Sequence, residues 1–337
     1  MRRKLKVLLL FDSPYETPRG YDFKEEFKHP DWKTEMDVYK ALLDNGYDVV
    51  LLGISGNILL LLEETKESKP DIVFNMAEVF KDKSRLEKNI AWFLEMLEVP
   101  YTGASPSNFL VCSNKALSKK ILSYHKIKIP HFYTFYREHK VWLPKKLKTP
   151  LIVKPLDEEA SRGISQASIV DTEDALVERV RFIHEKMSSD AIVEEYIDGR
   201  ELYVSLIGRK RISVFPPIEM KFGDMPDDEP KIATYRAKWD KEYRRKWGIR
   251  NEFTGRLSDS MIDEVSDVCK RAYKALDIEC YARFDVRVDP SNQVYVLEAN
   301  ANPCIAKDED FGQSAEKGGL SYPRLINKII RLGFGRK

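Results

Sequence analysis

The chain has 337 residues, with 56 Lys or Arg against 54 Asp or Glu, which gives a formal net charge of +2. This balance argues against a protein that neutralises many nucleic-acid phosphates, and an apolar content of 43% excludes a disordered chain. The length predicts roughly two to three domains, each able to bury a core.

The amino terminus resembles a secretion signal only at first sight. The apolar run at 7–11 ends at Asp12 without a small-residue cleavage site, so we expect a buried strand and a cytoplasmic protein. The apolar stretch at 58–62 is far shorter than the ~20 residues of a membrane helix, so no membrane partner is expected. The cysteines lack zinc-type spacing and should be reduced thiols, Cys304 being the one candidate for reactivity among Cys112, Cys269, Cys280 and Cys304.

Strand-like and helical segments alternate over the first 101 residues. Strands are predicted at 6–11, 48–54, 71–75 and 99–101, with one helix over 85–98 and another that a Thr34–Asp37 capping box opens and Gly46 ends. Such alternation is typical of a parallel sheet covered on both faces, whose ligands bind beyond the carboxyl ends of the strands. The connection over 12–33 is long enough to be functional or mobile.

The later elements follow a different pattern, with antiparallel strands. We expect helices over 108–124, 172–186 and 260–276, the last opened by Ser260 and Asp263, and strands at 151–153, 191–196, 202–206 and 211–215. The segment 221–252 is polar and aperiodic, which predicts a long mobile excursion. Boundaries near Asn114 and Gly199 divide the chain into an N-terminal α/β substrate-binding domain, a central lobe and a C-terminal lobe, over 1–114, 115–199 and 200–337.

The most informative pattern is a hairpin over 283–300, two alternating strands around the turn sequence DPSN at 289–292. With a four-residue loop, Asp285 faces Val296 and Arg283 faces Glu298. Because cross-strand partners share a face, the count predicts a polar face and a core face. The polar face holds Arg283, Asp285, Glu298 and Asn300, and the core face holds Phe284, Val286, Val288, Tyr295 and Leu297.

Two carboxylates and an amide oxygen on one face form a set of hard oxygen donors. Mg²⁺ takes one or two carboxylates and completes its shell with water and substrate phosphates. The pattern therefore indicates a metal site at Asp285, Glu298 and Asn300, for Mg²⁺ or Mn²⁺. A solvated polar face of a hairpin would give the same pattern from composition alone.

The sequence EANANP at 298–303, after the RFDV strand, resembles the metal-binding signature of the ATP-grasp superfamily, and most closely that of the D-alanine–D-alanine ligase-like carboxylate–amine ligases. Further segments fall in that family's order and spacing, namely 74–78, 99–103, 112–115, 152–155, 193–197 and Glu201. Each is weak alone, but together they are a strong signal. The resemblance implies an α/β fold, in which an N-terminal parallel-sheet domain precedes a two-lobed ATP-grasp part of α+β type.

The resemblance also implies where ATP would bind. Lys115 and Lys154 match the two lysines that hold the phosphates as point charges. Residues 157–165, with Ser161 and Gly163, match the loop that closes over the phosphates, although the acidic start of this loop departs from the family pattern. The family's segment beside adenine corresponds in this chain to Glu194, Glu195, Tyr196 and Ile197. Glu201 would take the ribose hydroxyls.

The reaction implied by the resemblance is a two-step ligation, in which a carboxylate attacks the γ-phosphate of ATP and an amine then attacks the acyl phosphate. Metal and lysine charges suit phosphoryl transfer. Lys238, in the segment YRAKW, would lie near the γ-phosphate, and Arg283 would stabilise the oxyanion of the second step. The partners implied are a small-molecule carboxylate and an amine.

The substrate-binding motifs depart from those of D-alanine–D-alanine ligases. The glycine-rich first turn is replaced by FDSPY at 11–15, with Glu35 as a loose candidate for holding an amino group, and Glu78 stands where those enzymes carry a histidine. After the metal motif, a glycine and a serine are replaced within CIAKDED at 304–310. We therefore expect a different substrate pair, with Glu35 and Glu78 favouring a cationic group and Lys307 meeting a carboxylate.

Two other classes of function stay open. A glutathione-synthetase-like or carboxylase-like ATP-grasp enzyme would keep the fold, and bicarbonate-dependent ATP hydrolysis would identify the carboxylase. A catalytically silent nucleotide-binding module would bind without turnover, but the complete set of metal ligands and both lysines argue against it. Relatives are often dimers, so the resemblance is compatible with a homodimer.

Overall fold

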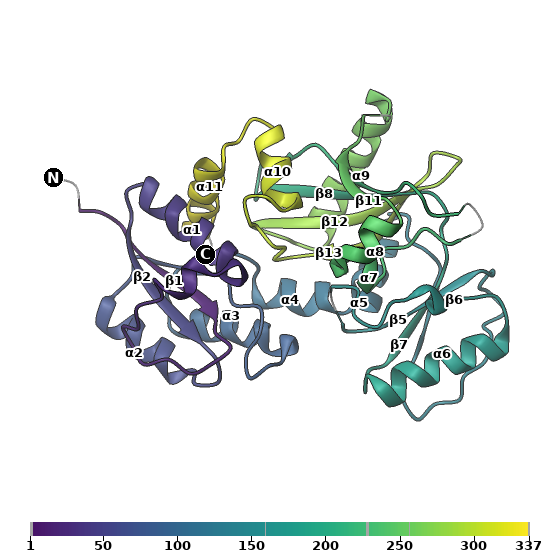
Figure 1. The fold of residues 1–337 in the computed structure, drawn as a ribbon, viewed down its shortest axis with the longest axis horizontal. Helices are drawn as coiled ribbons and strands as arrows, with labels where there is room; N and C mark the ends of the chain where they lie inside the picture. The colour runs from purple at the N-terminus through teal and green to yellow at the C-terminus, as the bar shows by residue number, and fades with distance from the viewer. Residues whose placement is uncertain (1–2, 159, 227–228, 256, 336–337) are drawn as a thin grey trace.

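The computed structural model describes residues 3–158, 160–226, 229–255 and 257–335 (Figure 1). An N-terminal parallel sheet has the strand order β2-β1-β3. Its strands are β1 (Lys6–Asp12), β2 (Asp48–Ile54) and β3 (Ile72–Asn75). The predicted parallel sheet is confirmed, except that the segment 99–101 adds a single bridge, Val73–Tyr101, rather than a strand.

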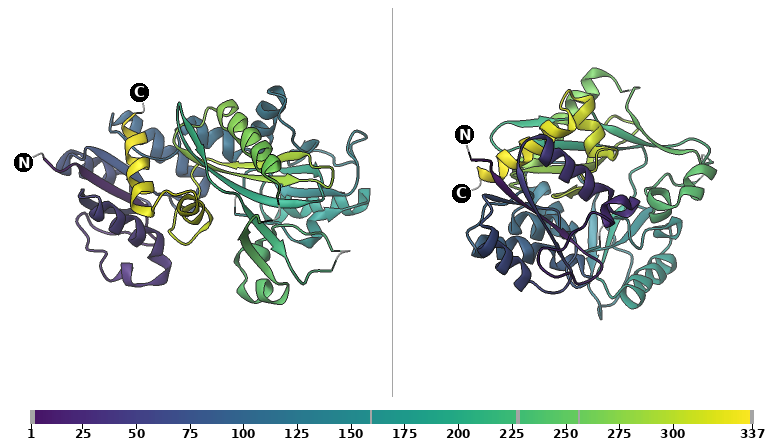
Figure 2. Two further views of the ribbon diagram at one scale, coloured as in Figure 1. Left: turned by 90° about the horizontal axis from the view of Figure 1, so that it is seen from above. Right: turned by 60° about the vertical axis from the view of Figure 1, so that its left-hand side comes forward.

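Alternation along β1 buries both faces of this sheet. Val7 and Leu9 pack in one core with α1 (Lys33–Asp44) and α11 (Tyr322–Phe334), whereas Leu8 and Leu10 pack in another. The second core includes α2 (Leu59–Ser68) and α3 (Glu87–Met96). Figures 1 and 2 show α11, from late in the chain, beside α1 at the N-terminal sheet. The carboxyl ends of β1 and β3, where the candidate substrate residues lie, are therefore held from both sides.

The connection over 12–33 carries two short 3-10 helices, Glu26–Lys28 and Pro30–Trp32, and two more lie at Ser84–Leu86 and Gln166–Ser168. The predicted capping boxes were wrong. The residue before α1 is Trp32, so Thr34 lies inside the helix, and α9 (Asp259–Ala275) is capped by Ser258 rather than Ser260. In α9 the Ser258 side chain accepts the Met261 N–H, which is the usual geometry of such a cap.

The two lobes downstream are built on antiparallel sheets. The central sheet has the order β4-β7-β5-β6 and is covered by α6 (Glu173–Lys186). Its strands are β4 (Phe132–Phe135), β5 (Leu151–Pro155), β6 (Ile169–Val170) and β7 (Ala191–Glu195). The C-terminal sheet has the order β11-β10-β8-β12-β13, with β9 paired to β8. Its strands are β8 (Arg200–Gly208), β9 (Ile212–Val214), β10 (Ile218–Phe222), β11 (Ile249–Phe253), β12 (Tyr281–Val288) and β13 (Val294–Asn300).

Two predicted segments differ from the structure. The helix expected over 108–124 is two helices, α4 (Pro106–Ser113) and α5 (Lys115–Tyr124), because Asn114 turns the chain and its side chain caps α5 at the Leu117 N–H. The segment 221–252, expected to be an irregular excursion, contains α7 (Tyr235–Trp239), α8 (Lys241–Lys246) and most of β11. Helices this short give no periodic signal in a sequence.

The hairpin of β12 and β13 has a different register from the predicted one. Val288 pairs with Val294, so the connection has five residues, and a bulge then leaves Leu297 out before Asp285 pairs with Glu298. Each one-residue shift reverses the face of the residues beyond it, and two shifts restore it.

The predicted polar face is therefore correct in spite of two errors of register, and the predicted core face is correct for Phe284, Val286 and Val288 of β12 but wrong for β13. Val294 and Val296 are buried in the core, and Tyr295 and Leu297, which were expected there, are only half-buried. Because of the bulge, Leu297 and Glu298 both line the same cavity.

The three-part division of the chain stays a prediction. α11 packs on the N-terminal sheet, and α10 (Asp310–Lys317) contacts β8 of the C-terminal sheet. In the part of the chain that the structure describes, no helix combines the length and the apolar character needed to cross a membrane.

Candidate active site

A narrow cavity of about 60 Å³ lies between the central and C-terminal lobes. Strands β5 and β7 contribute one wall, and β8, β12, β13 and α7 contribute the other. Predicted site residues that line it are Lys154, Ser161, Glu194, Glu195, Tyr196, Ile197, Glu201, Lys238, Asp285 and Glu298. Ion pairs join lining residues within each wall, Lys154 with Glu194, Lys238 with Asp285 and Arg287 with Glu201.

The central-lobe wall is organised by Glu194, which is 1% exposed. One carboxylate oxygen accepts a hydrogen bond from Lys154 Nζ at 3.0 Å, and the other lies 3.3 Å from Lys119 Nζ. Burial alone would raise the pKa of Glu194, but these two ammonium groups lower it. The Lys154 side chain is therefore held at the cavity by its hydrogen bond to Glu194.

The predicted metal ligands face each other at the opposite wall. Asp285 accepts from Arg283 Nε at 2.8 Å and from Arg283 Nη2 at 3.2 Å, and lies 3.8 Å from Lys238 Nζ. Burial raises the pKa of Asp285 in spite of these cations. The guanidinium of Arg283 also lies 4.9 Å from the ring centre of Tyr203, a buried residue of β8 that the sequence did not single out.

Glu298 is ionised by its surroundings. Its carboxylate lies 3.2 Å from Lys115 Nζ. Although burial would raise its pKa, Lys115, Lys238 and Lys154 lower the pKa of Glu298 to about 2. Lys115 also donates to the carbonyl of Glu158 in the phosphate loop.

The donor set fits a magnesium ion bound together with phosphate. Asp285 and Glu298 are paired across the hairpin, and Asn300 pairs with Arg283 one step further along. Among the described residues, no three or more His, Cys, Asp or Glu side chains are grouped to hold a metal. Two carboxylates and an amide suffice for Mg²⁺ when phosphate oxygens complete its shell.

The predicted adenine segment is already engaged in the fold. The N–H groups of Glu195 and Tyr196 donate to the carbonyls of His131 and Pro150. The carbonyl of Ile197 accepts from Arg287 at 2.6 Å. A base held here would have to use other backbone groups of the segment.

Arg287 also pairs with the predicted ribose ligand. Its Nη2 donates to Glu201 Oε2 at 2.8 Å, and its guanidinium lies 5.0 Å from the ring centre of Tyr196. Arg287 is 3% exposed and lines the cavity. The alternation that selected Arg283 and Asp285 would have found it, because the third residue of that face is Arg287.

The phosphate loop is shaped by left-handed backbone. Ala160, Ser161 and Gly163 have φ of 54°, 59° and 73°, values that favour glycine. At Gly163 a Cβ would meet Met187 Sδ at 2.3 Å and Pro155 Cγ at 2.9 Å, so a side chain there would have to displace Met187, and Gly163 does not line the cavity. Trp239 and Tyr235 of α7 reach over the loop, donating to the carbonyls of Ala160 and Ile164 at 3.1 Å each.

The candidate substrate residues gather at the carboxyl ends of β1 and β3. Asp12 accepts the Glu78 N–H at 2.8 Å. Glu35 Oε2 is buried with no hydrogen-bond partner among the described residues. Burial, with the charge of Asp12, raises the pKa of Glu35. Thr34, the neighbour of Glu35, lies 3.9 Å from Cys304 Sγ, which brings α1 to the end of the metal motif.

Two further candidates lie in this region, Lys307 for binding a carboxylate and Cys304 as a reactive thiol. Lys307 is exposed, and its backbone N–H reaches Asp37 on α1 at 3.4 Å. Cys304 is exposed, whereas Cys112, Cys269 and Cys280 are buried. Desolvation, aided by the Glu78 and Glu309 carboxylates, raises the pKa of Cys304 to about 11, which disfavours a reactive thiolate.

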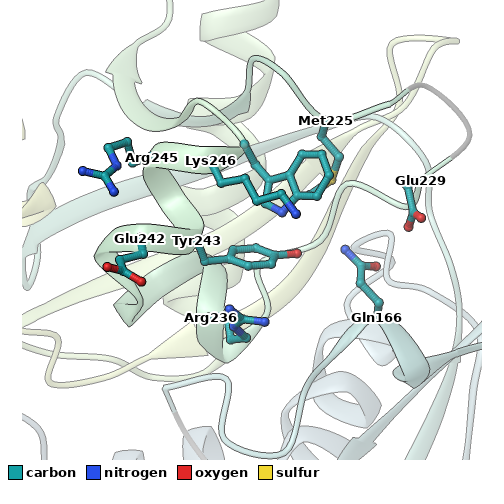
Figure 3. A pocket seen from close by; sticks show the side chains of 9 residues that line it. Gln166, Met225, Glu229, Arg236, Glu242, Tyr243, Arg245 and Lys246 are labelled. Carbon is teal, nitrogen blue, oxygen red and sulfur yellow. The ribbon is translucent and has the colours of Figure 1, made fainter.

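A larger hollow of about 560 Å³ lies beside α7 and α8. Figure 3 shows Tyr243 of α8 pointing across it toward Gln166. Arg236 and Lys246 lie over the rings of Tyr243 and Trp247, at 4.6 and 4.4 Å from the ring centres. None of the predicted site residues lines this hollow, so its size does not make it the active site.

Comparison with known families gives a match over residues 121–331 to a model described as the D-ala D-ala ligase C-terminus. A D-alanine–D-alanine ligase of Carboxydothermus hydrogenoformans is 26% identical over 88% of this chain and 91% of its own. A protein of Sinorhizobium fredii named uncharacterized protein y4sG is 29% identical over 98% of this chain and 94% of its own.

The fold is shared with solved structures. The D-alanine–D-alanine ligase of Bacillus anthracis, in a crystal structure with ATP, matches with a TM-score of 0.74 at 22% identity and covers 98% of both chains. A second crystal structure of that enzyme gives a TM-score of 0.75. The expected fold, a parallel-sheet α/β part followed by a two-lobed ATP-grasp part, is confirmed by these matches.

Proposed function

The chain belongs to the D-alanine–D-alanine ligase family of ATP-grasp proteins, and from this we propose that it is an ADP-forming ligase that joins a carboxylate to an amine. The observation that carries the proposal is a cavity lined by Lys154, Lys238, Asp285 and Glu298, with Lys115 paired to Glu298 beside it. A polyphosphate with a divalent cation supplies the charges that would separate these pairs.

The proposed roles follow from this arrangement. Lys115, Lys154 and Lys238 would hold ATP phosphates, with the loop around Ser161 lying over them and the segment 194–197 beside the base. Asp285, Glu298 and Asn300 would hold Mg²⁺ or Mn²⁺, which when bound neutralises charge on the transferred phosphoryl group. One carboxylate oxygen of Glu201 would remain bound to Arg287, and the other would accept hydrogen bonds from the ribose hydroxyls.

The two chemical steps require no side-chain nucleophile. The substrate carboxylate attacks the γ-phosphorus, and ADP leaves with the bridging oxygen. The amine then attacks the acyl phosphate, phosphate leaves, and the amine loses a proton. Arg283 would stabilise the oxyanion of the tetrahedral intermediate. Because Arg283 is bound to Asp285 through two hydrogen bonds, its position depends on the metal carboxylate.

We propose that the substrates are not two molecules of D-alanine. Asp12, Glu35 and Glu78 bring three carboxyl groups to the substrate end of the site. Because burial raises the pKa of Asp12 and of Glu35, a cationic amine bound there would be favoured by restoring their ionised forms. The exposed Lys307 would meet a carboxylate. A homodimer is compatible with this proposal, which places every site residue within one chain.

The test is an ADP-release screen over pairs of carboxylates and amines, with and without Mg²⁺. Turnover should be greatest for a pair that includes a cationic amine, and full turnover with D-alanine alone would contradict the substrate assignment. Glu298→Gln should lose nearly all turnover while retaining nucleotide binding, measured by calorimetry with ADP. A wild type that binds ADP but turns over no pair would support a silent nucleotide-binding module instead.

A further inference from the structure

A buried lysine that the proposed chemistry does not use lies between the nucleotide wall and the metal hairpin. Lys119 of α5 is 1% exposed. Its ammonium group donates to the carbonyl of Leu297 at 2.6 Å and lies 3.3 Å from Glu194 Oε1. A lysine this deeply buried is rare unless paired, so these contacts decide its place in the fold.

The first partner of Lys119 is the β-bulge of β13. The ladder passes from Val296 to Glu298, so Leu297 is the extra residue whose backbone is not fixed by pairing with β12. The Lys119 ammonium donates a hydrogen bond to the carbonyl of this residue. Glu298, the next residue, is the proposed metal ligand. Lys119 thus holds the backbone one residue before the carboxylate.

The second partner of Lys119 is the carboxylate behind Lys154. Glu194 is shared, with one oxygen toward Lys119 and the other accepting from Lys154. Without Lys119, the buried Glu194 carboxylate would interact with Lys154 in place of sharing its charge between two ammonium groups. The Lys154 ammonium would then be held more tightly against β7 and be less able to turn to a phosphate.

We infer that Lys119 is a positioning residue that couples the metal site to the nucleotide site, fixing Glu298 through Leu297 and releasing Lys154 through Glu194. The inference rests on the proposed function for the identity of the two ligands. Lys115 lies four residues before Lys119 and so shares its helix face, which brings a direct contact and a supporting contact to Glu298 from one helix.

The experiment measures the dissociation constant of ADP by calorimetry, in Mg²⁺ and in EDTA, for wild type, Lys119→Met and Lys120→Met. Lys120 is the exposed neighbour on the same helix and serves as the control. In wild type Mg²⁺ should tighten ADP binding. In Lys119→Met the half-saturating Mg²⁺ concentration should rise about tenfold and the Mg²⁺ effect on ADP should shrink accordingly, as for other residues that support a metal ligand. Lys120→Met should match wild type.

The outcomes separate the two proposals. A folded Lys119→Met variant with the wild-type Mg²⁺ effect would overturn the inference and leave the proposed ligase intact. A wild type that binds no ADP in either condition would overturn the proposed function, and the inference with it. Should Lys119→Met fail to fold, Lys119→Met with Glu194→Gln removes both charges of the buried pair, and the same loss of coupling is expected.

Discussion

At the scale of single residues, the cavity shows how buried charges are paired. Each predicted metal carboxylate lies against at least one cation, with Asp285 beside Arg283 and Lys238, and Glu298 beside Lys115. The carboxylates and lysines of the site could be predicted from the sequence, because their types and spacing can be read from it directly. Of their supporting partners, Arg287 continues the alternation of Arg283 and Asp285 and could have been found. Lys119 could not, because it resembles an ordinary surface charge until the fold buries it.

Glu35 offers a test of the substrate end of the site. Its folded pKa is raised above the usual 4.5, chiefly by burial, so the folded state binds more protons than the unfolded state between the two pKa values. Stability conferred by protonated Glu35 is therefore present below about pH 4.5 and is lost as the pH rises through the folded value.

We expect Glu35→Gln to melt at nearly the wild-type temperature at pH 4 and above it at pH 7, by about 1–2 °C for each kcal/mol gained in a chain of this length. The same variant should turn over a cationic substrate more slowly, since it lacks the charge. Thermal melts over a range of pH check the expected change in stability, and turnover at pH 7 checks the expected change in activity. A variant that melts below wild type at pH 7 would show that Glu35 has a stabilising partner.

At the scale of elements, the largest difference between sequence and structure is at the β12–β13 hairpin. Counting from the turn assumes an unbroken ladder, and neither a fifth loop residue nor a bulge changes the composition of the strands. The predicted polar face was nevertheless correct, because the two departures cancel in a period of two. The core residues Val294 and Val296 were missed because they lie between the loop and the bulge, where only one of the two departures applies.

The break between α4 and α5 leads to a prediction. Asn114 caps α5, whose first two turns carry Lys115 and Lys119, and Asn114→Ala should cost about 1 kcal/mol and weaken ADP binding. Thr172 caps α6 in the same way, but α6 carries none of the proposed site residues. Thr172→Ala should therefore lower the melting temperature while leaving ADP affinity unchanged. Equal ADP affinity in both variants would contradict a link between the α5 cap and the site.

At the scale of the whole molecule, α11 ties late sequence to the first sheet. A Cβ at Gly333 would lie 2.8 Å from both Ile72 Cδ1 and the Tyr101 carbonyl oxygen. At Gly335 the nearest atom is the flexible end of Arg209, at 3.2 Å. No sequence pattern announces such a contact, because it joins residues more than two hundred positions apart.

Gly333→Ala should therefore destabilise the protein by about 1–3 kcal/mol through overpacking, although alanine is the better helix former. Gly335→Ala, on the same stretch of chain, should be nearly neutral. Thermal melts of the two variants, with hydrogen exchange of the β1 and β3 amides, compare them. Unchanged protection of β3 in a Gly333→Ala variant would contradict close packing of α11 on that sheet.

The docking of α11 also sets an order of events during synthesis. The ribosome completes β1, β2 and β3 long before it reaches residues 322–334, at a rate that makes the interval on the order of tens of seconds. During that time one face of the new sheet, with Val7, Leu9 and Phe74, has α1 available to cover it but lacks α11. Both ATP-grasp lobes are made within this interval. The first strands to emerge are therefore among the last to be fully packed. A chaperone that shields apolar strands would bind near the start of this chain.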